Sequence, residues 1–139
     1  MTTTAPGYVS TLLAPGPALL RFSLRLDAVV TAANGLAYLA LSGPIESLLG
    51  LDTAVGIPIG IFLTLYGIGV ALVGLPANIN PVAVRAVITG NAAWVVVSLA
   101  ALIAGVLDVN AIGTVWAVLQ AIVVGAFAAM QYLGLRRAR

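Results

Sequence analysis

Cysteine, histidine and lysine are absent from the 139 residues of this chain, and each absence removes a class of chemistry. Without cysteine there are no disulfides, no thiol redox reactions and no Cys-ligated metals. Without histidine as well, haem ligation by either residue, a Ser-His-Asp triad and a typical zinc site are excluded. We therefore expect no enzyme activity, no cofactor and no metal site.

Charge of either sign is also scarce. Charged residues make up 7% of the chain and hydrophobic residues 62%, whereas an ordinary soluble domain is about 25% charged. The six arginines form no basic tract, so nucleic acid is not an expected partner. A soluble core cannot absorb this much apolar surface, and the composition predicts a one-domain integral membrane protein surrounded by membrane lipids. The bias toward Ala, Val, Gly and Arg is typical of a GC-rich bacterial genome.

Four apolar stretches are long enough to cross about 30 Å of hydrocarbon as helices that rise about 1.5 Å per residue. They lie near Leu24–Leu41, Ala54–Leu75, Val82–Val106 and Ala111–Leu135. The predicted fold class is all-α, an integral membrane four-helix transmembrane bundle over residues 21–139. Residues 1–20, rich in Thr, Pro and Gly, are expected to form a flexible or interfacial N-terminal arm.

The charges are sorted by side of the predicted membrane. All six arginines fall on one side and three acids on the other, namely Arg21, Arg25, Arg85, Arg136, Arg137 and Arg139 against Glu46, Asp52 and Asp108. Because positive residues are enriched in cytoplasmic segments, both termini are predicted in the cytoplasm of a bacterial inner membrane.

The connections between spans have local signals. Pro44 and Glu46 follow Gly43 as in a helix start, which predicts a short amphipathic helix on the outer surface. Asp52 is expected to cap the second span, and Asn80 followed by Pro81 the third. Residues 108–110 are barely enough for a turn, so the last two spans should be antiparallel neighbours.

A faint repeat relates the two halves. The segment at residues 51–56 resembles residues 107–113 with one insertion, and Arg25 before the first span corresponds to Arg85 before the third. Two helical hairpins in parallel orientation would give this pattern, and so would coincidence in a low-complexity chain. Small-residue pairs such as Gly56 and Gly60 indicate close helix contacts, either within the bundle or between copies.

Polar residues within the spans are the candidate site. Burying an amide in hydrocarbon without a partner is costly, so these groups should face one another inside the bundle. One interpretation is a small polar binding pocket, and the other is interhelical hydrogen bonding that only fixes the packing. The pocket would be lined by Asn34, Tyr38, Asn91, Trp94 and Gln120.

Asp27 is the one acid within a predicted span. Its depth is similar to that of Arg85, which predicts a structural ion pair between them near the inner interface. A proton-coupled carrier would instead require a carboxylate deeper in the membrane. Small multidrug exporters of similar length place a Glu in the middle of their first helix, where this chain has Asn34.

Three segments resemble small four-helix membrane proteins of high-GC bacteria that are distantly DoxX-like. They are Leu24-Arg25-Leu26 opening a helix with Gly35 in its middle, Asn91-Ala92-Ala93-Trp94, and Leu133-Gly134-Leu135-Arg136-Arg137. The resemblance covers residues 21–137. It implies a four-helix bundle with an accessory role beside a membrane oxidoreductase, and it assigns no catalytic residue.

Two function classes follow. The first is a non-enzymatic accessory, scaffold or lipid- and partner-binding subunit, favoured by the lack of a catalytic constellation. The second is a small dimeric transporter or exporter, favoured by four spans and a polar bundle interior. Either class allows a homodimer or a larger membrane complex.

Overall fold

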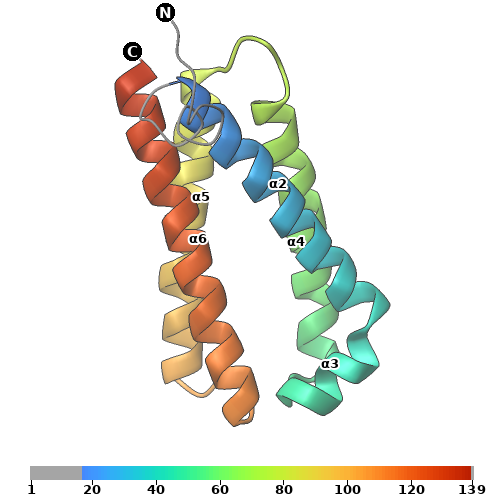
Figure 1. Cartoon of the computed structure of the whole chain (residues 1–139). Helices are drawn as coiled ribbons and strands as arrows, with labels where there is room; N and C mark the ends of the chain where they lie inside the picture. Colours follow the sequence, from blue (N-terminus) through green and yellow to red (C-terminus); the bar gives the residue numbers. More distant parts are fainter. Residues whose placement is uncertain (1–16, 139) are drawn as a thin grey trace, which may run out of the picture.

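The computed structural model describes residues 17–138, which form five α-helices and no strand (Figure 1). The helices are α2 (Pro17–Ala40), α3 (Ser42–Leu49), α4 (Thr53–Gly74), α5 (Pro81–Ile103) and α6 (Ala111–Ala138). Most of the predicted arm, residues 1–16, lies outside the described part. Residues 17–20, the last part of the predicted arm, form the first turn of α2, which begins at Pro17, where the missing N–H of proline costs no hydrogen bond.

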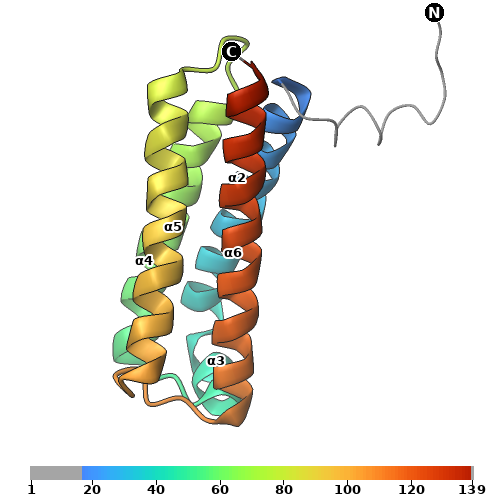
Figure 2. The same ribbon diagram turned by 90° about the vertical axis from the view of Figure 1, so that its left-hand side faces the viewer.

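The four long helices are arranged as two pairs. α2 packs along α4 and α5 packs along α6, and the two pairs meet chiefly where α2 contacts α6 (Figures 1 and 2). The α4–α5 contact is the weakest between helices. Figure 1 shows the pairs close together at the end that holds the C-terminus and separated toward α3. The expected antiparallel pairing of the last two spans is confirmed.

Glycines bring α2 and α4 into close contact. A Cβ atom added at Gly67 would lie 2.7 Å from the backbone nitrogen of Ala32, and one at Gly60 would lie 2.9 Å from the carbonyl oxygen of Gly35. Gly74 continues the contact against Leu24. The contact therefore repeats every seventh residue from Gly60, whereas a Cβ at Gly56, the other member of the predicted pair, would meet its neighbours at ordinary van der Waals distances.

Helix caps agree with the sequence at two connections. The Asp52 carboxylate accepts a hydrogen bond from the amide of Ala54, and the Asn80 side chain accepts from the amide of Val82, each at 2.9 Å. At the third connection Asn110 caps α6 by accepting from Gly113 at 2.8 Å. Asp108 lies in the turn before this cap and has a positive φ of 52°.

Helix α3 lies across the end of the bundle. It is bent by 93° from α2 and contains the predicted short helix, beginning at Ser42. Asn110 holds it to α6, since its backbone nitrogen donates to the Leu49 carbonyl and its side-chain nitrogen to the Leu48 carbonyl, each at 3.0 Å. α3 therefore bridges the two separated helix pairs.

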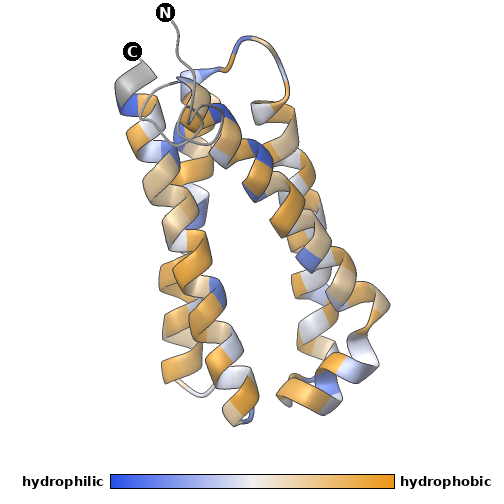
Figure 3. Cartoon of the chain, in the orientation of Figure 1, coloured by the Kyte–Doolittle hydropathy of each residue, from blue (hydrophilic) through white to orange (hydrophobic). Residues whose placement is uncertain are grey.

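The outer surface of the helices is apolar over most of their length (Figure 3). Residues such as Leu72 and Ile103 are exposed by 70% and 86%. Helices α4, α5 and α6 are each long and apolar enough to cross a membrane, and α2 with α3 meets the same test as a bent pair, which gives three to four candidate spans. The chain therefore has the features of a multi-pass membrane protein, as predicted.

Candidate functional site

Asp27 is the centre of a buried hydrogen-bond network. Its side chain is 1% exposed, and its carboxylate accepts from the Thr31 hydroxyl at 2.7 Å. The other carboxylate oxygen accepts from the side-chain nitrogens of Asn91 and Gln131, each at 2.8 Å. Asn91 also donates to the Gln131 carbonyl oxygen at 3.0 Å. The network therefore joins α2, α5 and α6.

Tyr66 extends this network to α4. Its hydroxyl lies 2.9 Å from the Val87 carbonyl oxygen and 3.1 Å from the side-chain oxygen of Asn91. The ring of Tyr66 also lies against Gly90, where an added Cβ would come within 2.6 Å of the hydroxyl. All four long helices therefore contribute a side chain to the hydrogen bonds around Asp27.

The structure does not bring Asp27 and Arg85 together as the predicted ion pair. Arg85 lies on an exposed face of α5, whereas Val84 and Asn91, which are seven positions apart, face the interior. Similar depth in the bundle does not make two residues neighbours, because successive helical residues point about 100° apart. Arg25 instead donates to the carbonyls of Gly74 and Leu75 at the end of α4.

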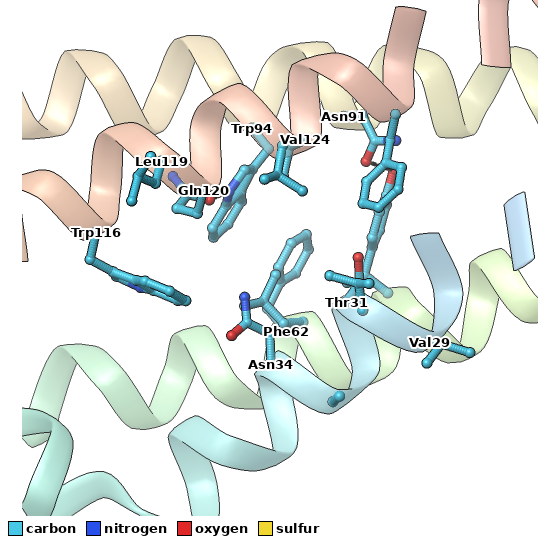
Figure 4. Close-up of a pocket in the computed structure, with 17 residues that line it drawn as sticks. Val29, Thr31, Asn34, Phe62, Asn91, Trp94, Trp116, Leu119, Gln120 and Val124 are labelled. Carbon is cyan, nitrogen blue, oxygen red and sulfur yellow. Dashed lines mark hydrogen bonds between the residues drawn. The ribbon is translucent and has the colours of Figure 1, made fainter. Parts of the chain in front are cut away.

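A cavity of about 470 Å³ lies between the helix pairs, next to this network. Four of the predicted site residues line it, namely Asn34, Asn91, Trp94 and Gln120 (Figure 4). No hydrogen bond joins the side-chain amides of Asn34, Asn91 and Gln120 to one another. The three residues line the same cavity without direct contact between their amides. A smaller cavity of about 210 Å³ toward α3 is lined by Tyr38, the fifth predicted residue, and again by Asn34, Trp94 and Gln120.

Two hydrogen bonds cross the region where the cavities adjoin. The indole nitrogen of Trp94 donates to the side-chain oxygen of Gln120 at 2.7 Å, and that of Trp116 donates to the Tyr38 hydroxyl at 2.8 Å. Gln120 also donates to the Ala117 carbonyl at 2.9 Å. Packing bonds and empty space therefore coexist, and the two interpretations of the polar interior each describe part of it.

The larger cavity reaches the apolar surface of the bundle. Its lining includes Val29 on α2 and Leu119 and Val123 on α6, which are exposed by 67%, 52% and 43%. On the α4–α5 side an aromatic stack forms the wall, because the Phe62 ring lies 5.5 Å from that of Trp94 and 5.6 Å from that of Tyr66 (Figure 4). The opening therefore faces the surface that lipid would cover.

Several residues of the site were not selected from the sequence. The i, i+4 spacing of Asp27 and Thr31 puts both on one helix face, and the structure shows a direct hydrogen bond between them. Trp116 lies near the start of α6, where tryptophan is typical of a membrane interface, and Gln131 lies near the other end of the same helix. Phe62 carried no signal at all, since one aromatic residue in an apolar helix is unremarkable in sequence.

Within residues 17–138 no three His, Cys, Asp or Glu side chains lie together as ligands for a metal ion. The site offers uncharged amides, hydroxyls, indoles and aromatic faces, with one carboxylate behind them. This set can bind a molecule through hydrogen bonds and apolar contacts. Comparisons of the chain with protein-family models, with curated proteins and with solved structures find no match.

Proposed function

We propose that this chain is a non-enzymatic integral membrane protein that binds an apolar molecule dissolved in the bilayer. The observation that carries the proposal is the cavity of about 470 Å³, whose lining includes exposed apolar side chains of α2, α4 and α6. Ligand sites are typically concave and mostly apolar, with a few polar groups that fix the orientation of the ligand. Asn34 and Gln120 would supply such groups here.

The ends of the cavity support entry from the membrane rather than from water. Toward the termini the interior is filled by Leu24, Val70 and Val84, which are 0–1% exposed, and by the network around Asp27. Toward α3, the bonds of Asn110 to Leu48 and Leu49 join α3 to α6. A molecule already in the bilayer would meet the opening directly.

The proposed setting is a bacterial inner membrane crossed four times, with both termini in the cytoplasm. The sorting of arginines and acids to opposite ends supports this orientation through the positive-inside rule. The pairing of α2 with α4 and of α5 with α6 agrees with two repeated hairpins. The DoxX-like resemblance adds the proposal that the ligand-bound protein is an accessory subunit of a larger membrane complex.

Tryptophan fluorescence tests the binding proposal, because the chain has two tryptophans and both line the cavity. The purified full-length protein in lipid nanodiscs would be titrated with a brominated long-chain alcohol, since bromine quenches tryptophan on contact. We expect quenching that saturates at low mole fraction. Quenching that rises linearly with bromine content, as for a tryptophan exposed to bulk lipid, would refute the proposal.

A matched pair of variants locates the quencher. Val124 lines the cavity, whereas Ile122 on the same helix is 61% exposed and does not. Val124→Phe should fill the space and remove the saturable quenching, and Ile122→Phe should leave it unchanged. Equal effects of the two variants would place the binding elsewhere.

A small dimeric transporter is the second candidate. The burial of Asp27 favours it, because ionisable groups inside membrane proteins mark ion and substrate pathways more often than packing positions. Flux of a bound compound in proteoliposomes under a pH gradient distinguishes the two functions. Binding without flux supports the first, and flux lost in Asp27→Asn supports the second.

A further inference from the structure

The carboxylate of Asp27 has no basic partner among the side chains that the structure describes. Its three hydrogen-bond partners, Thr31, Asn91 and Gln131, are uncharged. All three donate to it, which suits an ionised carboxylate because that group only accepts hydrogen bonds. The bundle therefore holds a carboxylate in its interior that accepts hydrogen bonds from three uncharged side chains and contacts no arginine among the described residues.

This carboxylate lies directly behind the cavity wall. Thr31 and Asn91 bond to Asp27 and also line the cavity, and Tyr66 lines it while bonding to Asn91. One layer of side chains therefore separates the carboxylate from the empty space. Because the surroundings are apolar, the field of a charge decays less here than it would in water.

Aromatic rings are concentrated around the same space. Aromatic residues make up 6% of the chain, yet Phe62, Tyr66, Trp94, Trp116 and Phe127 all line this cavity. Figure 4 shows the side chains of Phe62, Trp94 and Trp116 directed toward the space between the helices. The faces of such rings attract cations.

The lining offers little to an anion. It contains no charged side chain, and the indole N–H groups of Trp94 and Trp116 already donate to Gln120 and Tyr38. An anionic head group would therefore find few free donors, and it would lie next to the carboxylate of Asp27. Both effects disfavour fatty acids and acidic lipids in this cavity.

We propose that the ligand of the cavity is a cationic amphiphile, with an amine, quaternary ammonium or similar group on an apolar body. This inference rests on the proposed binding function and specifies the charge of the ligand. The cation lies among the aromatic rings, with Asp27 as its counter-charge behind Thr31 and Asn91. The apolar body extends toward the exposed lining residues Val29, Leu119 and Val123.

Competition in nanodiscs of uncharged lipid tests the charge preference. Three amphiphiles with the same tetradecyl chain, a trimethylammonium, an alcohol and a sulfate, would displace the brominated alcohol, with each dose expressed as mole fraction in the membrane. We expect the ammonium to act at a roughly tenfold lower mole fraction than the alcohol and the sulfate to be weakest. Equal potency of ammonium and alcohol in the native chain would overturn the proposal.

Variants of Asp27 assign the preference to its charge. Asp27→Asn keeps the shape and the ability to hydrogen-bond, and it should abolish the advantage of the ammonium over the alcohol. Asp27→Glu keeps the charge and should retain the advantage. A preference that persists in Asp27→Asn would contradict the role of Asp27. If that variant does not fold, the comparison of the three amphiphiles in the native chain decides.

The same experiments distinguish failure of the proposed binding function from failure of the proposed ligand charge. If the brominated alcohol itself shows no saturable quenching of the native protein, the proposed function falls and this inference falls with it. If the alcohol binds and the ammonium has no advantage, the binding function stands and only the cationic class is refuted.

Discussion

The side-chain nitrogen of Asn91 lies 2.8 Å from a carboxylate oxygen of Asp27, although 64 positions separate the two residues in the chain. This bond ties the first helix of one pair to the first helix of the other. Replacing Asn91 with Leu should destabilise the bundle by about 1–3 kcal/mol, because it removes a donor from a buried carboxylate and from Gln131. Denaturation from mild detergent into SDS, followed by circular dichroism, measures the loss. Thr89→Val, at an exposed position of the same helix, should have almost no effect, and equal losses would argue against the network.

Arg25 and Arg85 should differ sharply when each is replaced by alanine. Arg25 bonds to the Gly74 and Leu75 carbonyls, which are unsatisfied groups at the end of α4, and its loss should cost about 1 kcal/mol. Arg85 is exposed, so its loss should cost less than about 0.5 kcal/mol. The same unfolding assay compares them. In a double-mutant cycle, the losses of stability caused by Asp27→Asn and Arg85→Ala should be additive. A coupling energy above about 0.5 kcal/mol would support the ion pair predicted from the sequence.

Gly67 and Gly69 offer a matched test of the α2–α4 contact. A methyl group at Gly67 meets Ala32 within 2.8 Å, whereas one at Gly69 meets nothing within 4 Å. Gly67→Ala should therefore destabilise the protein by about 1–3 kcal/mol through overpacking. Gly69→Ala should be neutral or slightly stabilising, because alanine favours the helix by up to about 1 kcal/mol. Thermal unfolding in detergent checks both, and similar melting temperatures would show that the close approach is not needed.

Because the chain contains no cysteine, single cysteines can be introduced to map its topology without removing native ones. Ser47 on α3 and Asn78 in the loop before α5 are both exposed and lie at opposite ends of the bundle. With the proposed orientation, Ser47→Cys should react with a membrane-impermeant maleimide in bacterial cells whose outer membrane has been made permeable, and Asn78→Cys should react only after full lysis. The reverse pattern of labelling would show that the protein has the opposite orientation in the membrane.

Hydropathy and local caps were sufficient to predict most of the fold. The apolar stretches, the Asn80 cap with Pro81, and the Asp52 cap depend on residues close together in the chain, so their physics is visible in sequence. The partner of Asp27 could not be found in this way. Its identity depends on the rotation of α5 about its axis, which turns Asn91 inward and Arg85 outward, and residue counting fixes depth but not rotation.

The residues of the candidate site could be predicted in part, but the shape of the cavity could not. Asn34, Asn91 and Gln120 were grouped because each is polar and near the centre of a span, and all three line one cavity. The separation of the helix pairs that makes the cavity arises from the 93° bend before α3 and from the contact of α3 with α6. No local pattern encodes that separation, so Phe62 and Trp116 could not be recognised as its walls.

The glycine contact between α2 and α4 has a mechanical consequence. Two helices held at such short range behave as one stiff arm, while α5 and α6 form the other arm, and the two arms are clasped near Asp27. A small rotation about that clasp displaces atoms in proportion to their distance from it, so Trp116 would travel farther than Asn91. The bonds of Asn110 to α3 would therefore limit how far the two helix pairs can separate, while the network around Asp27 acts as the pivot.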